Sequence, residues 1–413
     1  MTSAAITTTP SDPARPIASR RHGTGFWIVA IAYLLTMAFS TVPTPLYGLY
    51  QLRDGFPTFL TTVIFAAYAV GVMASLYLAG HISDWVGRKR MIQVSILIEL
   101  LAAAVFLIWP EVPGLIVARF VTGVGIGTLT ATATAHLTEL RAAGRPGNGP
   151  RTSAAVSTFA NIGGLALGPL VAGVLAQFVI APLAVPYWVF IVLLVASAVA
   201  VAFVPETIER SEVRHPYHPQ RIALPKSARG RFFAAAVAAF AAFAVFGLFT
   251  SLAPSFIAGT LRETSHLVAG AITFAVFGAA AVAQVVFAGL ALRRQLQLAL
   301  VLMVAGLAFI AVGVLIVSLP VFVLAGIVAG AGVGVLFRAS LSVAGSLAVP
   351  EARGEVLALL FLVAYAGLAI PVLLIGLALA FLPSSTVLVG FAVVVIALVS
   401  IFTARLIATT RAR

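Results

Sequence analysis

Charged residues are scarce in this sequence, and their scarcity excludes most classes of protein. Of the 413 residues only 9% are Asp, Glu, Lys or Arg, whereas 62% are hydrophobic, and the mean hydropathy is +1.13. A soluble domain carries about 25% charged residues. The chain lacks the polar surface of a soluble enzyme, a nucleic-acid-binding domain or a disordered protein, and we expect an integral, multi-pass membrane protein.

Cysteine is absent and lysine occurs only at Lys89 and Lys226. Without cysteine the chain can form neither a disulfide framework nor a thiolate metal site. Abundant alanine and arginine are associated with GC-rich bacterial genes, so we expect the bacterial plasma (inner) membrane. No Gly-x-x-x-x-Gly-Lys-Ser/Thr nucleotide-binding motif is present. We therefore expect no cofactor, metal or nucleic-acid partner, and an ion gradient as the energy source.

Long apolar windows predict twelve transmembrane helices, since each crossing of the bilayer needs about 20 apolar residues. The first window is too long for the apolar core of a cleaved signal, so we expect a retained helix. We expect tails at residues 1–25 and 409–413. A linker, residues 205–231, is expected to join an N-terminal half, residues 26–204, to a C-terminal half, residues 232–408. The predicted spans are 26–49, 57–79, 91–109, 112–135, 152–178, 185–204, 232–258, 265–291, 297–317, 320–345, 355–381 and 385–408.

The net charge of +13 is distributed in clusters between these windows. With both termini in the cytoplasm, 21 of the 25 basic residues fall on the cytoplasmic side. Only Arg53 and Arg262 lie in outside loops, and Arg119 and Arg338 lie within spans. Because cytoplasmic loops are enriched in Lys and Arg, we predict that both termini are cytoplasmic.

Glycine patterns recur between the two halves. Gly123-Val-Gly-Ile-Gly127 recurs as Gly330-Ala-Gly-Val-Gly334, 207 positions later, and Gly71 and Gly278 are separated by the same interval. Gly164-Leu-Ala-Leu-Gly-Pro169 is similar to Gly367-Leu-Ala-Ile-Pro371. Parallel six-helix halves are a secondary-transporter architecture, with the substrate site between the halves at mid-membrane.

The loop between the second and third spans carries a family motif. It reads Gly80-His-Ile-Ser-Asp84-Trp-Val-Gly87-Arg88-Lys89-Arg90. It resembles the signature loop of the major facilitator superfamily, Gly-x-x-x-Asp-basic-x-Gly-basic-basic, but Trp85 stands where a basic residue is usual. The resemblance extends over residues 26–407 and implies an all-α membrane fold of 12 transmembrane helices in two pseudo-symmetric six-helix bundles.

The same resemblance implies a cytoplasmic gate. In the family this loop latches the cytoplasmic side of the outward-open state, and Arg88 would pair with Glu139 at the inner end of span four. Asp84 could meet the positive end of the helix that begins near Gly354. Gly80 permits close helix approach, and Gly87 permits a tight turn.

Two further segments fit the family. Arg119-Phe-Val-Thr-Gly123-Val-Gly125 resembles its Arg-x-x-x-Gly-x-Gly pattern, in which the Arg is implicated in proton coupling. Span five contains Gly164, Gly168, Pro169 and Gly173, which resembles the Gly-x-x-x-Gly-Pro-x-x-x-Gly motif of exporters, especially drug/proton antiporters. The glycines would let span five pack tightly on its neighbours, and Pro169 would bend the helix.

Three charges inside spans are candidates for function because such residues are costly in a bilayer. Arg119 is either a proton-coupling residue or part of a structural pair. Glu99, in low dielectric, could take and release a proton or could stay neutral, and a Glu99–Arg119 pair is possible although their expected depths differ by about 8 Å. Arg338 either extends to the cytoplasmic interface or attracts anions at the inner mouth of the cavity.

Uncharged polar groups complete the candidates for the substrate cavity. Pro43 and Pro45 weaken span one and place Thr44 and Tyr47 on a bent segment. Asn161, Gln284 and Tyr365 lie at membrane depth as either ligand contacts or interhelical hydrogen bonds. Spans one, seven and eight contain no acid, which argues against a dedicated cation exporter.

These observations favour a monomeric secondary active transporter that moves a small molecule across the lipid bilayer by alternating access. We expect export coupled to protons. A proton symporter or an uncoupled facilitator for a metabolite or organic acid remains the alternative, and a membrane-embedded enzyme or receptor a remote one. The six histidines are scattered, so we expect no catalytic or metal site.

Overall fold

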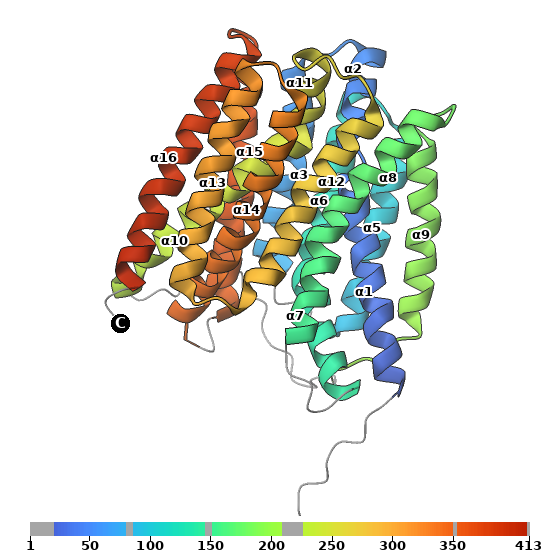
Figure 1. Ribbon diagram of the computed structural model, residues 1–413. Helices are drawn as coiled ribbons and strands as arrows, with labels where there is room; N and C mark the ends of the chain where they lie inside the picture. Colours follow the sequence, from blue (N-terminus) through green and yellow to red (C-terminus); the bar gives the residue numbers. More distant parts are fainter. Residues whose placement is uncertain (1–19, 80–85, 145–150, 209–225, 350–352, 411–413) are drawn as a thin grey trace, which may run out of the picture.

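The computed structural model describes residues 20–79, 86–144, 151–208, 226–349 and 353–410. The described residues form helices and loops without any strand. Twelve helical segments among them are long and apolar enough to cross a membrane. They stand side by side as a bundle (Figure 1), as the apolar windows predict.

The first six membrane segments form the N-terminal half. Two of them are interrupted: span one by a 3₁₀ turn and span five by a π-helical turn. The elements are α1 (Arg20–Thr41), η1 (Thr44–Leu46), α2 (Tyr47–Asp54), α3 (Thr58–Ala79), α5 (Arg88–Ile108), α6 (Val112–Gly144), α7 (Arg151–Thr158), η2 (Phe159–Gly163), α8 (Gly164–Phe178) and α9 (Val185–Ala202).

The last six segments form the C-terminal half. A π-helical turn interrupts span seven just before Pro254. The elements are η3 (Lys226–Ala228), α10 (Arg229–Gly247), η4 (Leu248–Leu252), α11 (Ala253–Gly259), α12 (His266–Val286), η5 (Phe287–Gly289), α13 (Leu292–Leu315), α14 (Leu319–Leu347), α15 (Arg353–Ala378) and α16 (Ser384–Thr410).

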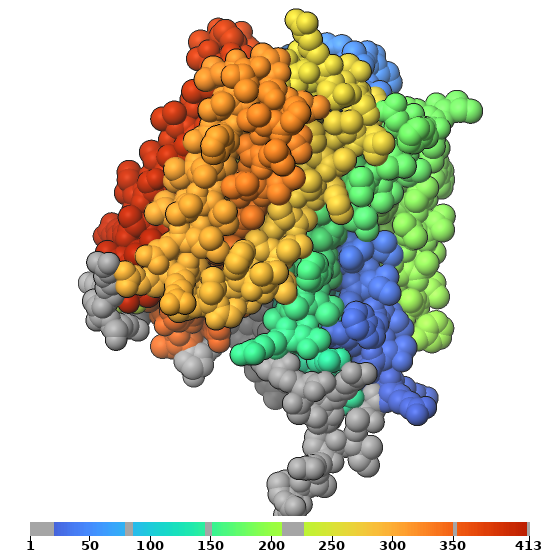
Figure 2. All heavy atoms as spheres, viewed as in Figure 1, coloured from blue at the N-terminus to red at the C-terminus, as the bar shows by residue number. Residues whose placement is uncertain are grey.

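The two halves have the same internal packing. In the N-terminal half α6 contacts α1, α3 and α5, and in the C-terminal half α14 contacts α10, α12 and α13. The halves meet through two matched helix pairs, α3 with α15 and α8 with α12. The two pairs are equivalent, because α3 corresponds to α12 and α15 corresponds to α8. A twofold axis along the bundle would produce this arrangement. Figure 2 shows the two halves side by side, the N-terminal half in blue to green and the C-terminal half in yellow to red.

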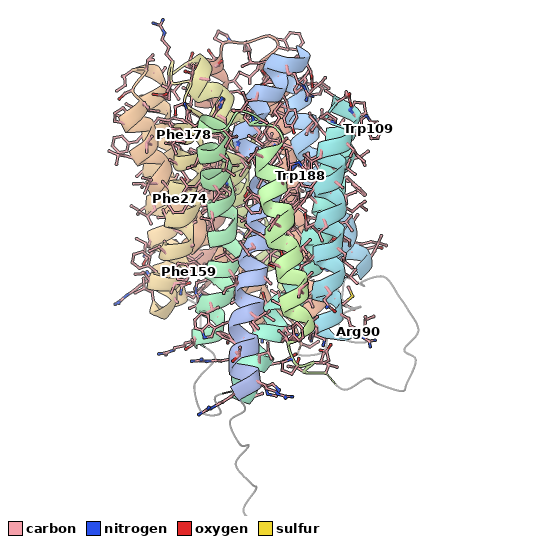
Figure 3. The ribbon with its side chains drawn as sticks, turned by 90° about the vertical axis from the view of Figure 1, so that its right-hand side faces the viewer. Arg90, Trp109, Phe159, Phe178, Trp188 and Phe274 are labelled. Carbon is pink, nitrogen blue, oxygen red and sulfur yellow. The ribbon has the colours of Figure 1, made fainter. Side chains whose placement is uncertain are left out.

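The two ends of the bundle differ in chemistry. We call the end at which α1 begins and α16 ends the terminal face, and the other end the opposite face. Figure 3 places Arg90 toward the terminal face of α5 and Trp109 at its opposite end. Trp109 and Trp188 are exposed on the outside of the bundle, as expected for aromatic side chains at a membrane interface.

The end of span four differs from the sequence prediction for a physical reason. Span four was expected to end at residue 135, but α6 continues to Gly144. Its 33 residues measure about 50 Å at 1.5 Å per residue, longer than the hydrocarbon core of about 30 Å. The polar end that carries Glu139 and Arg141 therefore projects beyond the apolar layer, where an apolar window gives no signal.

One of the glycine echoes is coincidental. Gly71 packs against α6, where an added Cβ would lie 3.0 Å from Gly123 Cα, whereas a Cβ on Gly278 would meet nothing within 4 Å. The backbone contacts of α6 and α14 explain the difference. Gly123 lies against Tyr68 O and Gly330 against Val276 O, so α3 and α12 are related by 208 positions, not 207. The counterpart of Gly71 is therefore the residue after Gly278.

Candidate functional site

The signature loop is joined to two other segments at the terminal face. Arg88 Nε lies 3.3 Å from Glu139 Oε1, so the expected ion pair is present. Glu206, just after α9, accepts a hydrogen bond from Arg88 N at 2.9 Å and from Lys89 N at 3.2 Å. Its carboxylate thus satisfies the first amides of α5, where a negative charge also favours the helix dipole. Thr207 Oγ1 donates to Glu139 Oε2 at 2.5 Å.

Gly87 is required at the start of α5. Its φ of +104° lies in the region that side chains rarely adopt. A Cβ here would also lie 2.5 Å from Glu206 Oε2. Both observations agree with the tight turn expected from the motif. Gly80 and Asp84 lie outside the described residues, so the contact expected between Asp84 and the helix near Gly354 stays a prediction.

Span one breaks where its prolines stand, and the break exposes backbone carbonyls. Helix α1 ends at Thr41, and the chain resumes as η1 and α2. Pro43 and Pro45 have no N–H to donate to the preceding turn. Arg119, which is 2% exposed, donates from Nη1 to Ser40 O at 2.5 Å. A cation therefore satisfies a carbonyl at the C-terminal end of α1, where the helix dipole favours it.

The Arg119 guanidinium also stacks on aromatic rings of α3. Its Cζ lies 4.4 Å from the centroid of the Tyr68 ring and 5.6 Å from that of Phe65. Such cation–π contacts are strongest where water is excluded. Tyr47 follows the break, and its buried hydroxyl has no hydrogen-bond partner. Arg119, Tyr47 and Tyr68 thus share one buried region near the break.

Glu99 lies in the interface between α5 and α6 and is fully buried. Neither of its carboxylate oxygens has a hydrogen-bond partner. A Cβ on Gly125 would lie 3.0 Å from Glu99 Cδ, so this glycine of the Arg-x-x-x-Gly-x-Gly pattern makes room for the carboxyl group. The pattern therefore serves a packing purpose as well as carrying Arg119.

The expected Glu99–Arg119 pair is not hydrogen-bonded, although the two charges interact electrostatically. The difference in their depths is about what the sequence suggested. Glu99 packs on Gly125 of α6, and Ser95, one turn earlier in α5, lies 2.8 Å from Thr128 Oγ1. Gly125 lies six residues after Arg119, which at 1.5 Å per residue is about 9 Å along α6, close to the expected 8 Å.

The C-terminal half supplies a counterpart for this interface. A Cβ on Gly332 of α14 would lie 2.8 Å from Met303 N and 2.9 Å from Met303 Cγ. Gly332 lies 207 positions after Gly125, so Met303 occupies in the C-terminal half the place that Glu99 occupies in the N-terminal half. An apolar side chain can therefore fill this place in a six-helix bundle.

The glycines of the exporter-like motif pack α8 against two helices. A Cβ on Gly164 would lie 2.6 Å from Leu34 O of α1, and one on Gly173 would lie 2.6 Å from His266 O of α12. Gly168 faces Ala38 O and Thr41 Oγ1. Span five thus packs closely on α1 of its own half at the start of the motif and on α12 of the C-terminal half at the end of the motif.

Pro169 removes one bond of α8, and span one replaces it. The Leu165 carbonyl, four residues before the proline, accepts a hydrogen bond from Thr41 Oγ1 at 3.1 Å. Asn161, in the π-helical turn that precedes α8, donates from Nδ2 to Tyr33 OH at 2.8 Å. Both are hydrogen bonds between spans one and five.

The remaining cavity candidates occupy separate places. Tyr365 of α15 meets Tyr68 of α3 with ring centroids 6.3 Å apart, across the boundary between the halves. Thr44 is buried in η1 and Gln284 is buried in α12. Arg338 is half-buried in α14 near the terminal face, and its Nε has no hydrogen-bond partner. The structure therefore brings Tyr365 to Tyr68 and the Arg119 region, but not Arg338.

The halves are hydrogen-bonded to each other at the opposite face. Ser255 of α11 donates to Gln51 Oε1 of α2 at 3.2 Å. Gln177 Oε1, at the end of α8, accepts from Ser265 Oγ at 3.3 Å and from His266 N at 3.1 Å. These bonds join the first span to the seventh and the fifth to the eighth (Figure 1).

Sequence reasoning missed several partners of the predicted residues. Tyr68 and Ser40 hold Arg119, and Glu206 holds the signature loop. Glu206 could have been suspected, because it is an acid that directly follows the last apolar residues of span six. Tyr68 and the Ser40 carbonyl give no comparable signal, since one is an aromatic residue among many and the other is backbone.

Two matched six-helix halves, joined through α3 with α15 and α8 with α12, define a polytopic secondary transporter. The chain belongs to the major facilitator superfamily, whose family model matches residues 29–372. It is thus a multi-pass membrane transporter of small molecules and not an enzyme.

Solved structures with the same fold have low sequence identity to the chain. A bacterial homolog of the human lysosomal transporter Spinster, in an inward-facing and unoccupied conformation, has a TM-score of 0.70 at 13% identity, covering 95% of this chain and 98% of that one. The human organic anion transporter MFSD10 (TETRAN) has a TM-score of 0.65 at 18% identity, covering 92% and 100%. The nucleoside transporter NupG, in a mutant form, has a TM-score of 0.70 at 12% identity, covering 92% and 99%. No curated protein matches the sequence significantly.

Proposed function

We propose that the chain exports a small molecule from the cytoplasm in exchange for protons, across the plasma (inner) membrane of a bacterium. The terminal face is the cytoplasmic one, because basic side chains cluster at the helix ends there, as at Arg88 and Arg293. The hydrogen bonds of Gln51 and Gln177 then close the external side. Two six-helix halves that meet through matched helix pairs can rock about this boundary to open either side.

The carboxyl group of Glu99 is the observation that supports proton coupling. It is fully buried, and neither oxygen has a hydrogen-bond partner. An ionised carboxylate without a partner is strongly destabilised in a low dielectric, whereas the protonated group is tolerated. The structure thus suits a state in which Glu99 holds a proton.

The internal repeat argues that packing alone does not require this acid. Met303 fills the equivalent place against Gly332, and an apolar residue there avoids the cost of burying a carboxyl group. A glutamate that persists at such a position calls for a reason other than stability. Uptake and release of a proton provide one.

Arg119 is the group that could transmit the protonation of Glu99. In this structure its guanidinium is held by Ser40 O and the Tyr68 ring. Loss of the Glu99 proton would create a buried anion one to two helical turns along α6 from Arg119 and attract the guanidinium away from the break in span one. Because Tyr68 contacts Tyr365 of the other half, such a movement reaches the boundary between the halves. One proton moving down 100 mV supplies about 2.3 kcal/mol, enough for roughly fiftyfold extrusion.

The charges of the boundary region favour neutral, amphipathic or anionic substrates over cations. Arg119 lies next to Tyr68. Among the described residues of spans one, seven and eight the one acid is Asp54 at the end of α2, and it is already paired with Arg53. The human organic anion transporter MFSD10 shows that this fold can carry anions. The tight packing of Gly164 and Gly173, which form part of the exporter-like motif, supports export.

The decisive experiment first finds a substrate and then tests coupling. Susceptibility and uptake of a compound panel are compared at two external pH values in cells that lack or overproduce the protein. With an identified substrate, proteoliposomes are assayed for pH-driven transport and for exchange without a gradient. Glu99→Gln and Glu99→Met should retain exchange and lose pH-driven accumulation. Glu355→Gln, the same chemical change in the first turn of α15, should keep both.

Other results would select other functions. Transport that ignores a collapsed proton gradient would identify an uncoupled facilitator. Movement of the substrate into the cell in the same direction as protons would identify a symporter for a metabolite or organic acid. Unchanged pH-driven transport in Glu99→Gln would refute the role of this carboxyl group while leaving secondary transport in place.

A further inference from the structure

A small cavity lies between α10 and α16 at the terminal face, far along the chain from the Arg119 region. Its volume is about 160 Å³. Phe233 and Phe402 pack edge to face beside it, with ring centroids 5.6 Å apart, and hold the two helices together. The lining residues are Ser227, Gly230, Arg231, Ala234, Arg405, Leu406 and Thr409.

The cavity carries two positive charges and no negative one. Arg231 comes from α10 and Arg405 from α16, and neither has an ion-pair partner within the described part of the chain. Arg231 Nε is buried without a hydrogen-bond partner. Arg405 reaches across to α10, since a Cβ on Gly230 would lie 3.7 Å from Arg405 Nη2. Two guanidinium groups from different helices thus converge on one small space.

One further donor faces the same place. Ser227 adds a hydroxyl group to the lining. Guanidinium groups and hydroxyl groups are donors that proteins use to bind phosphate.

We propose that this cavity binds a phosphate group, and that the group belongs to an anionic phospholipid. The proposal depends on the membrane location of the chain and not on the direction or coupling of transport. Basic pockets between transmembrane helices at the cytoplasmic side bind anionic lipid headgroups.

The surface of α16 favours a lipid over a soluble phosphate. Ile401 lies one helical turn from Arg405 toward the middle of the membrane, and Val394 two turns further; their exposed fractions are 61% and 59%. An exposed apolar stripe therefore leads away from the cavity along the lipid-facing side of the bundle (red in Figure 1). A headgroup phosphate bound by Arg405 would place its acyl chains along this stripe.

The test measures ligand binding to the purified full-length chain in a neutral detergent. Phosphatidylglycerol, phosphatidylcholine, glycerol phosphate and inorganic phosphate are titrated separately, with the rise in unfolding temperature and native mass spectrometry as readouts. Phosphatidylglycerol should bind and stabilise, and Arg231→Gln/Arg405→Gln should bind about thirtyfold more weakly, from about 1 kcal/mol per arginine. Arg293→Gln/Arg294→Gln, with the same change of charge at the start of α13, should bind like the unmodified chain.

The outcomes are distinct. Binding of phosphatidylglycerol, but not of glycerol phosphate, identifies a lipid headgroup, whereas binding of the soluble phosphates at the same arginines supports the phosphate site and assigns it a soluble ligand. Equal weakening in both double variants, or no binding of any phosphate compound, overturns the proposal. Because Arg405 is exposed, Arg405→Gln alone should fold and provides the test if the double variant does not.

Discussion

The hydrogen bond from Thr41 to the Leu165 carbonyl should contribute measurably to stability, because Pro169 leaves that carbonyl without its helical donor. Thr41 Oγ1 lies 3.1 Å from Leu165 O and also 3.1 Å from Ala38 O in its own helix, and Thr41 is 6% exposed. Thr41→Val keeps the shape of the side chain and removes the hydroxyl. Interhelical hydrogen bonds in membranes average about 0.6 kcal/mol, and a buried carbonyl left without a donor costs about 1–3 kcal/mol. We expect a loss of about 1 kcal/mol.

A second variant makes the reasoning specific. Pro169→Ala restores a backbone N–H at the position that normally bonds to Leu165 O, so α8 can satisfy the carbonyl itself. Thr41→Val should therefore cost less in the Pro169→Ala background than in the original chain. The expected coupling between the two changes is about 0.5–1 kcal/mol.

The four proteins can be compared by unfolding in mixed micelles of increasing SDS content, followed by tryptophan fluorescence. Thr138→Val is the matched control, since the Thr138 hydroxyl is exposed and bonds only to Thr134 O in its own helix. It should change the free energy of unfolding little. If Thr41→Val costs the same in both backgrounds within about 0.3 kcal/mol, the hydroxyl does not replace the missing N–H and the reasoning is wrong.

Three further predictions use the same structure. Gly87→Ala should destabilise the folded protein by about 1–3 kcal/mol, because the φ of Gly87 is positive and Glu206 is adjacent. Gly278→Ala should not, because a Cβ at Gly278 meets free space; thermal unfolding of the two variants distinguishes these results. Gln177→Leu should open the opposite face more often, because it removes the acceptor of two hydrogen bonds; distances between spin labels on the two halves measure this. The chain has no cysteine, so an impermeant maleimide should label Leu52→Cys from outside intact cells and Arg90→Cys only after lysis; the reverse pattern contradicts the orientation.

The architecture was predictable because it depends on properties that sequence records directly. A membrane helix needs only length and apolarity, and a repeat of glycines such as Gly123 and Gly330 records close packing of equivalent helices. The ends of helices were less predictable, since α6 continues beyond the apolar layer on polar residues. The match between Gly71 and Gly278 wrongly indicated equivalent positions, because small residues are common in all membrane helices.

The site was predictable in its members and not in its contacts. The sequence indicated Arg88 with Glu139 through a known motif, and Arg119 and Glu99 through their charge. It did not indicate that Arg119 binds the Ser40 carbonyl, because a backbone acceptor becomes available only where Pro43 and Pro45 break the helix. The expected depth difference of about 8 Å between Glu99 and Arg119 agrees with the contact of Glu99 with Gly125, six residues from Arg119, because it depends only on the rise per residue of two paired helices.

Proline breaks account for much of the polar chemistry within this bundle, and this makes Glu99 the exception. Arg119 binds a carbonyl at the break of span one, and Thr41 binds the carbonyl freed in span five. Where the bilayer offers no water, such groups are needed to satisfy the backbone, so their presence does not by itself indicate a ligand. Glu99 satisfies no backbone group and has no partner, and its counterpart is Met303. Satisfaction of the backbone explains Arg119 and Thr41, but it leaves this carboxyl group to be explained by what the transporter does.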